Sequence, residues 1–154
     1  MIISHKYNLC FCHIPKNAGT FISSFLKFID PNCIDVRNKG GLGHQTMSQI
    51  IHWQKHHKIN DYLNFCAIRS PSEKICSSYN FYYHNIYDDF DSFLLNLDSV
   101  QSNSGHLANI PYICELNNNI LPNIALINFD TITKDIALLF LSLGLAEEDF
   151  QKKI

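Results

Sequence analysis

The chain has 154 residues and a formal net charge of −2, with 46% hydrophobic and 17% charged residues. This length can bury a hydrophobic core within one domain, and the composition excludes an intrinsically disordered chain. We therefore expect residues 1–154 to form a single domain. The near-neutral net charge predicts no nucleic-acid partner, and no apolar run reaches the ~20 residues of a membrane span.

The charges are distributed unevenly along the chain. Residues 1–77 carry nine Lys or Arg and four Asp or Glu, whereas residues 78–154 carry three and ten. The basic first half is where we place the anion contacts predicted below.

The cysteines predict a reducing compartment. They form no CxxC pair, so neither a zinc site nor a thioredoxin-type motif is indicated. Several lie inside apolar runs, where a free cysteine behaves as a small hydrophobic residue. We read all of them as reduced thiols and expect a cytoplasmic protein. They are Cys10, Cys12, Cys33, Cys66, Cys76 and Cys114.

Short apolar runs alternate with amphipathic stretches along the chain. The first predicted strand begins at about Tyr7, which leaves no room for a signal peptide. The helix at Phe21–Ile29 has three phenylalanines near one face. Residues 100–119 show no clear pattern. In chain order we expect a strand at Tyr7–His13, a helix at Phe21–Ile29, a strand at Ile34–Arg37, a helix at Thr46–Lys58, a strand at Tyr62–Ile68, a helix from Pro71 to about Tyr83, a helix at Asp88–Leu97, a strand at Ile124–Phe129, and a helix capped by Thr131 or Thr133 and ended by Gly144.

This alternation predicts an α/β fold in which helices flank a central parallel sheet. Open sheets of this kind bind ligands at the carboxyl ends of their strands. The candidate functional residues of this chain fall at or just after those ends.

The first candidate stretch, His13-Ile14-Pro15-Lys16-Asn17-Ala18-Gly19-Thr20, runs from a strand into a helix. Such a turn directs free backbone N–H groups at one point, where an anion is favoured by the helix dipole. Lys16 adds a positive charge, Thr20 a hydroxyl, and Gly19 allows the backbone to approach an anion closely. The stretch is not a Walker A loop, because the lysine precedes the glycine.

The second candidate stretch combines a strand end with a helix. Arg69 follows the strand Tyr62–Ile68, and Ser77 lies about two turns into the next helix. A guanidinium binds phosphate oxygens in a bidentate manner, and a nearby hydroxyl completes a phosphate clamp.

Together the two stretches resemble the Golgi-type carbohydrate sulfotransferases, heparan 2-O-like members included, and their bacterial relatives. The family motifs read HIPKTAGTS and VRDPYERLVSAY, and here they read HIPKNAGTF and IRSPSEKICSSY. Gly43-His44-Gln45-Thr46 looks like the family's His-x-Thr segment. INFDTITKDIALLFLSLGL is similar to its strand–acidic–helix ending, with Asp130 at the acidic position. The resemblance spans residues 7–145 and suggests a short member of bacterial or viral type.

The resemblance implies a P-loop-like three-layer fold and 3′-phosphoadenosine 5′-phosphosulfate (PAPS) as sulfuryl donor. We expect no metal, because no ligand cluster is apparent and Lys16, Arg69 and backbone amides can meet the charge of the donor. It implies that Arg69 and Ser77 hold the 3′-phosphate. The 5′-phosphosulfate would be held by the loop residues Pro15, Lys16, Asn17, Ala18, Gly19 and Thr20. The acceptor would be a hydroxyl group of a glycan or a small molecule.

Two residues are candidates for catalysis. Lys16 could stabilise the charge that builds on the leaving oxygen. His44 could take the proton of the acceptor hydroxyl, because histidine titrates near neutral pH. The remaining histidines receive no catalytic role, although His13 is expected to orient the loop by hydrogen bonding. We read the aromatic run Asn80-Phe81-Tyr82-Tyr83 as core.

Two other functions stay open. A small P-loop phosphotransferase is one, although it would favour a Walker A loop. An inactive nucleotide-binding or interaction module of the same fold is the other. The sequence leaves open the acceptor, with a sugar favoured by analogy, and the oligomeric state.

Overall fold

A computed structural model describes residues 1–36, 45–104, 107 and 124–144 of the chain. In these residues a sheet with the strand order β3-β1-β2-β4-β5 is flanked by helices. The strands are β1 (Ile2–Ser4), β2 (Leu9–Phe11), β3 (Ile34–Asp35), β4 (Leu63–Ile68) and β5 (Ile124–Asn128). The helices are α1 (Gly19–Ile29), α2 (Met47–His57), α3 (Pro71–Ser78), the π-helix η2 (Tyr79–Tyr83), α4 (Phe90–Leu95), α5 (Leu97–Ser104), the 3-10 helix η3 (Phe129–Thr131) and α7 (Ile132–Ser142).

The centre of the sheet is parallel, as predicted. β2 pairs with β4, and β4 pairs with β5, both in parallel register. β1 is antiparallel to both of its neighbours, β2 and β3. The prediction that the first strand begins at about Tyr7 is wrong, because β1 already begins at Ile2. The three residues Ile2-Ile3-Ser4 are too few to show a period, so the sequence pattern gave no signal for β1.

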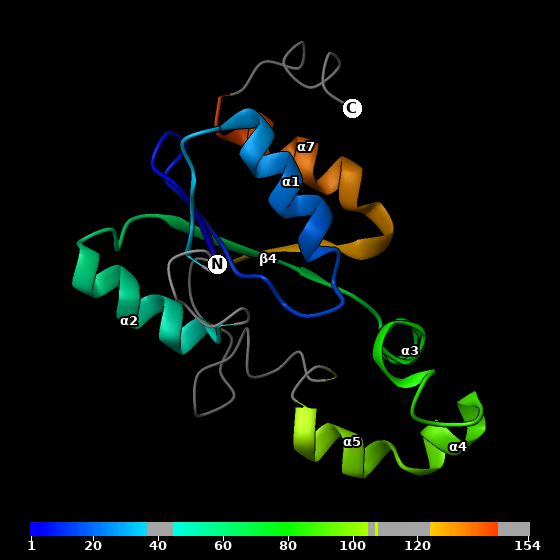
Figure 1. The fold of residues 1–154 in the computed structure, drawn as a ribbon. Coiled ribbons are helices and arrows are strands. Elements are labelled where there is room, and N and C mark those ends of the chain that lie inside the picture. The colour runs from blue at the N-terminus through cyan, green and yellow to red at the C-terminus, as the bar shows by residue number, and fades with distance from the viewer. Residues whose placement is uncertain (37–44, 105–106, 108–123, 145–154) are drawn as a thin grey trace.

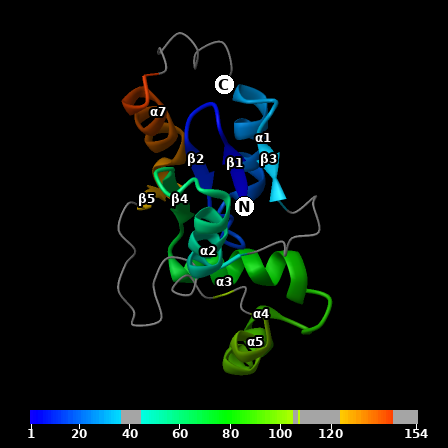
Figure 2. The same cartoon turned by 90° about the vertical axis from the view of Figure 1, so that its left-hand side faces the viewer.

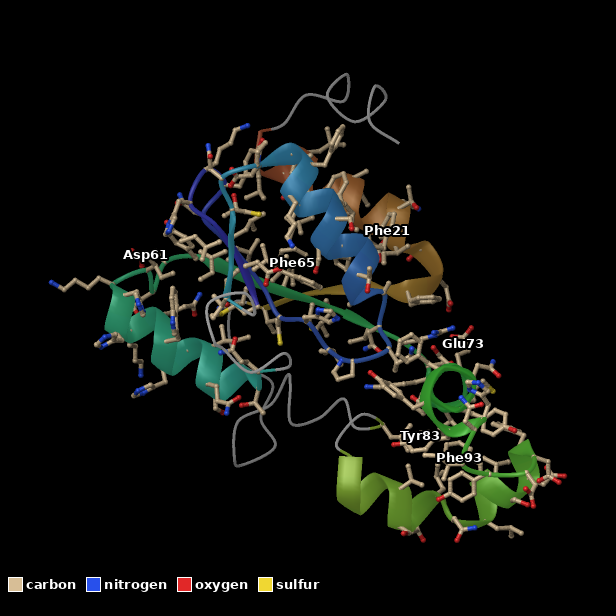
Figure 3. The ribbon with its side chains drawn as sticks, viewed as in Figure 1. Phe21, Asp61, Phe65, Glu73, Tyr83 and Phe93 are labelled. Atoms are coloured by element: carbon tan, nitrogen blue, oxygen red, sulfur yellow. The ribbon has the colours of Figure 1, made fainter. Side chains whose placement is uncertain are left out.

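Helices cover both faces of the sheet, which confirms the P-loop-like three-layer fold (Figures 1 and 2). Alternate strand residues point to opposite faces, so neighbours along β2 enter different cores. Phe11 and Phe65 pack with α1 and α7, as Figure 3 shows for Phe65 beneath α1. Cys10 and Cys12 pack with α2 on the other face. Burial raises the pKa of both thiols to about 12, so they stay protonated at neutral pH.

Helix α1 buries its aliphatic side in the core, and Phe25 packs against the edge of that core. Its buried apolar residues are Ile22, Leu26 and Ile29. The stripe of phenylalanines predicted from the sequence is largely exposed, with Phe21 at 47% and Phe28 at 54%. Both stripes have helical spacing, so periodicity alone could not decide between them.

Local capping fixes where the helices near the sheet begin and end. Thr46 starts α2 with a capping box that includes Gln49, and Ser70 caps α3 immediately before Pro71. These two starts agree with the predicted boundaries. Thr131 occupies the N-cap position of α7 without a side-chain bond to the helix backbone. Gly144, with φ of +83°, follows the end of α7.

Helices α3, η2, α4 and α5 form a group beyond the carboxyl end of β4 (Figure 1). Aromatic rings hold this group together. Tyr83 and Phe93 stack at 5.1 Å between ring centroids, and Figure 3 shows them side by side. Among the helices that the structure describes, none has both the length and the apolarity needed to cross a lipid bilayer.

Candidate active site

The loop between β2 and α1 has the backbone shape of an anion-binding turn. Lys16 and Ala18 both adopt positive φ, of +62° and +55°. Ala18 is also the N-cap of α1 and provides no side-chain hydrogen bond to the helix. The first N–H groups of α1 therefore lack a side-chain cap, and the helix dipole favours a negative group in front of them.

Asn17 ties this loop to the neighbouring strand. Its side chain is 1% exposed, and its Nδ2 donates a hydrogen bond of 2.8 Å to the carbonyl oxygen of Ala67 in β4. The Asn17 side chain thus braces the loop against the sheet, while Lys16 on one side of it faces the cavity described below.

Gly19 is required by its contact with His13. A Cβ at Gly19 would lie 1.9 Å from Nε2 of the His13 imidazole. The imidazole in turn stacks on Phe11 at 5.9 Å between centroids. A glycine at the start of α1 lets the histidine ring pack directly against the helix backbone. The sequence indicated a close approach here, but by an anion rather than by His13.

Arg69 follows β4 and reaches toward the loop. Its Nη1 donates a hydrogen bond of 3.4 Å to the backbone oxygen of Lys16. Its Nε lies 3.8 Å from Oε2 of Glu73, which Figure 3 shows on α3 beside the end of β4. Its guanidinium carbon lies 4.0 Å from the ring centroid of Phe129, the first residue after β5.

The ammonium of Lys16 lies over aromatic rings. Its Nζ is 3.6 Å from the ring centroid of Phe81 and 5.5 Å from that of Tyr82. Burial, and secondarily the charge of Arg69, lower the pKa of Lys16 below its ordinary value. The two cations are therefore close enough to influence each other.

Two adjoining cavities meet at these cations. One, of about 500 Å³, extends along α3 and η2 past Ser72, Cys76 and Asn80. The other, of about 470 Å³, lies over the loop and the start of α1, past Ala18 and Thr20. Four residues line both cavities, namely Lys16, Arg69, Ser77 and Phe81.

The structure brings most of the predicted site residues together. The cavity over α1 is lined by Pro15, Lys16, Ala18, Gly19, Thr20, Arg69 and Ser77, whereas the Asn17 side chain is buried behind the loop. His44 lies outside the residues that the structure describes. Gln45, the next residue, accepts a hydrogen bond of 3.6 Å from Sγ of Cys12. The chain after His44 thus runs beside the end of β2.

The prediction that the run Asn80-Phe81-Tyr82-Tyr83 is core is wrong for its first three residues, which are exposed. Phe81 is 63% exposed and Tyr82 is 39% exposed, and both line the cavity over α1. The reason is the π-helix η2, which presents these rings to the cavity while Tyr83 packs on Phe93. The i, i+4 spacing from Ser77 to Phe81 could have indicated that both lie on one helix face.

In the described part of the chain, no group of three or more His, Cys, Asp or Glu side chains could hold a metal ion. A positive site made of Lys16, Arg69 and uncapped N–H groups can instead bind a ligand that carries its own negative charge.

A comparison with protein families matches residues 1–153 to a family described as the sulfotransferase family. The comparisons with curated proteins and with solved structures give no match. The matched region contains both cavities and every residue that lines them.

Proposed function

Because the chain belongs to the sulfotransferase family, we propose that it is an enzyme that takes its sulfuryl group from PAPS. We propose further that the acceptor is a hydroxyl group of a sugar, since the two loop motifs resemble those of carbohydrate sulfotransferases.

One observation carries this proposal, namely that two adjoining cavities share Lys16, Arg69 and Ser77. PAPS has a phosphosulfate at its 5′ end and a phosphate at its 3′ position. A ligand with anions at both ends needs two anion sites in contact, whereas a nucleotide with one phosphorylated end does not.

Each end of the donor has suitable partners in this chain. The uncapped start of α1, with Lys16 and the hydroxyl of Thr20, suits the 5′-phosphosulfate. Arg69 and Ser77 suit the 3′-phosphate, because a guanidinium and a hydroxyl together satisfy several phosphate oxygens. Loop and strand end are held together by the bond from Asn17 to Ala67.

Lys16 is the proposed electrostatic catalyst. Negative charge develops on the oxygen that leaves during sulfuryl transfer, and a cation held beside it lowers the barrier. Lys16 belongs to the loop that suits the phosphosulfate, and it lines the cavity. The pKa of Lys16 is lowered. Only its protonated form, the ammonium, carries the positive charge that can stabilise the leaving oxygen.

His44 is the proposed general base. A positioned base of suitable pKa contributes typically ~10²–10⁴-fold to such a proton transfer. Support comes from its sequence position in the His-x-Thr segment and from its neighbour Gln45. Gln45 contacts Cys12, which directly precedes His13 at the cavity wall.

The experiment that tests the donor compares two ligands by calorimetry. The protein should bind 3′-phosphoadenosine 5′-phosphate more tightly than 5′-AMP, because only the former carries the 3′-phosphate. Arg69→Gln should abolish this preference. Lys55→Gln, which removes an exposed charge on α2, should leave it intact. Equal affinity of the wild type for both ligands would contradict the assignment of Arg69 and Ser77.

Binding alone would not separate an enzyme from a nucleotide-binding module. Transfer of labelled sulfate from PAPS to pooled glycans and small alcohols supplies the second measurement. Label on a sugar supports the proposed acceptor class, and label on another alcohol would replace it. Tight binding without transfer to any acceptor would favour the binding module.

A further inference from the structure

We propose that Phe81 and Phe129 are positioning residues, whose ring faces hold the Lys16 ammonium and the Arg69 guanidinium in the shared cavity. The contacts between rings and cations are observed in the structure. Their effects on sulfuryl transfer rest on the proposed function.

The rings can offset the repulsion between two cations that line the same cavities. Arg69 contributes to the lowered pKa of Lys16, so the two charges repel each other across the cavity. The bond from Arg69 to the Lys16 carbonyl is long, at 3.4 Å. The ion pair with Glu73 is also long, at 3.8 Å, and the Glu73 side chain is 44% exposed. At this separation, and with the Glu73 carboxylate exposed, the pair contributes little to holding the guanidinium in place.

The rings contact the cations more closely. Nζ of Lys16 lies 3.6 Å from the Phe81 centroid, and the guanidinium carbon of Arg69 lies 4.0 Å from the Phe129 centroid. Both distances are well within the ~6 Å over which the negative face of an aromatic ring attracts a cation. Phe81 is therefore the nearer of the two rings beside Lys16, with Tyr82 at 5.5 Å, and Phe129 is the ring beside Arg69.

Phe81 reaches Lys16 because of η2. The backbone N–H of His84 bonds the carbonyl of Tyr79 at 2.9 Å, which is the wider turn of a π-helix. π-helical turns occur frequently at functional sites. Phe81 is 63% exposed, so core burial does not explain its position. The ring of Tyr82 packs against Phe81 in a T-shaped arrangement, at 4.6 Å between centroids.

Phe129 is held by the turn that follows β5. The backbone N–H of Asn128 bonds Oδ2 of Asp135 at 2.9 Å, and Oδ1 of Asn128 accepts from the N–H of Asp130 at 3.1 Å. These bonds lie on both sides of Phe129. The ring is thereby fixed at the carboxyl end of the sheet, where Arg69 emerges from β4.

The two rings should affect different steps. Phe81 acts through Lys16, the proposed catalyst, so its loss should lower turnover more than affinity. Phe129 acts through Arg69, the proposed partner of the 3′-phosphate, so its loss should weaken binding of 3′-phosphoadenosine 5′-phosphate more than binding of 5′-AMP.

The test replaces each ring by leucine, which keeps apolar volume but removes the ring face. Phe81→Leu should lower kcat at least about threefold with affinity for 3′-phosphoadenosine 5′-phosphate nearly unchanged, and Phe129→Leu should weaken that affinity by a similar factor. Phe81→Tyr and Phe129→Tyr restore a ring face and should recover most of each loss. Phe28→Leu alters an exposed phenylalanine that lines neither cavity, and serves as the matched control.

A second measurement does not depend on activity. Reductive methylation of Lys16 in the ligand-free protein, followed by mass spectrometry, reports how available its unprotonated amine is. Phe81→Leu should raise this rate at least about twofold, because the ring no longer shields the ammonium or favours its charged form. Phe28→Leu should not change it, and melting curves confirm that all variants are folded.

The outcomes separate the two proposals. An unchanged methylation rate in Phe81→Leu overturns the positioning role of Phe81, whatever the enzyme transfers. Unchanged affinity for both ligands in Phe129→Leu overturns that of Phe129. Failure of the wild-type protein to bind 3′-phosphoadenosine 5′-phosphate would refute the proposed donor, while the methylation rates would still decide the role of Phe81.

Discussion

The contact between Gly19 and His13 makes a quantitative prediction about stability. A Cβ at Gly19 would lie 1.9 Å from Nε2 of His13, whereas an ordinary contact begins at 3.4 Å, so the ring must retreat by about 1.5 Å. It has little room, because His13 is 8% exposed and stacks on the buried Phe11. Overpacking of this kind costs about 1–3 kcal/mol, so Gly19→Ala should lower Tm by about 2–12 °C.

The assay is a double-mutant cycle measured by urea unfolding. His13→Ala removes the ring, so the cost of Gly19→Ala should fall by at least about 1 kcal/mol in that background. Alanine also favours helix over glycine, so any net loss in Gly19→Ala must come from the clash. Gly144→Ala is the control, because its Cβ would meet nothing within 4 Å and its cost comes from the backbone at φ of +83°. That cost should not depend on His13. A stable Gly19→Ala variant, or additive effects in the cycle, would refute the reasoning.

Four further predictions concern catalysis and charge. Lys16→Ala should lower turnover far more than donor affinity, as steady-state kinetics and calorimetry would reveal; loss of binding alone would indicate a ground-state contact instead. His44→Ala should keep donor binding but lose transfer, together with the rise in wild-type rate through the titration of histidine near pH 6.5; unchanged turnover would place the base elsewhere. Transfer should survive EDTA, and full loss restored by a divalent ion would contradict the metal-free proposal. Lys74 is fully buried, and burial lowers its pKa to about 8. The unfolded chain therefore binds more protons above pH 8, so the stability of the wild type should rise with pH relative to Lys74→Met, by up to about 3 kcal/mol near pH 10.5. A difference in unfolding free energy that does not depend on pH would refute this.

Much of the fold could be predicted because the relevant signals are local. Apolar runs marked β4 and β5, and the capping residues Thr46 and Ser70 marked the starts of α2 and α3. The cavity residues Lys16 and Arg69 were found because each follows a strand that ends at the same edge of the sheet.

The rest depended on contacts between distant parts of the chain. No local pattern could show that Asn17 would bond Ala67, 50 residues later, or that His13 would occupy the space above Gly19. The exposure of Phe81 depends on a π-helical turn, which aromatic composition does not reveal. β1 is only three residues long and is recognisable mainly by its pairing.

The hydrogen bond from Asn17 to Ala67 also makes the site selective for the distance between the two anionic groups of a ligand. β2 and β4 are adjacent strands in fixed register, about 4.8 Å apart, and the bond clamps the loop after β2 to the end of β4. Lys16 and Arg69 belong to these two elements, so the separation of their backbone positions is set by the sheet. A ligand whose two anionic groups have a different separation would satisfy one cation and miss the other. Such a ligand would bind more weakly than one of matching length, even where each contact taken singly is favourable.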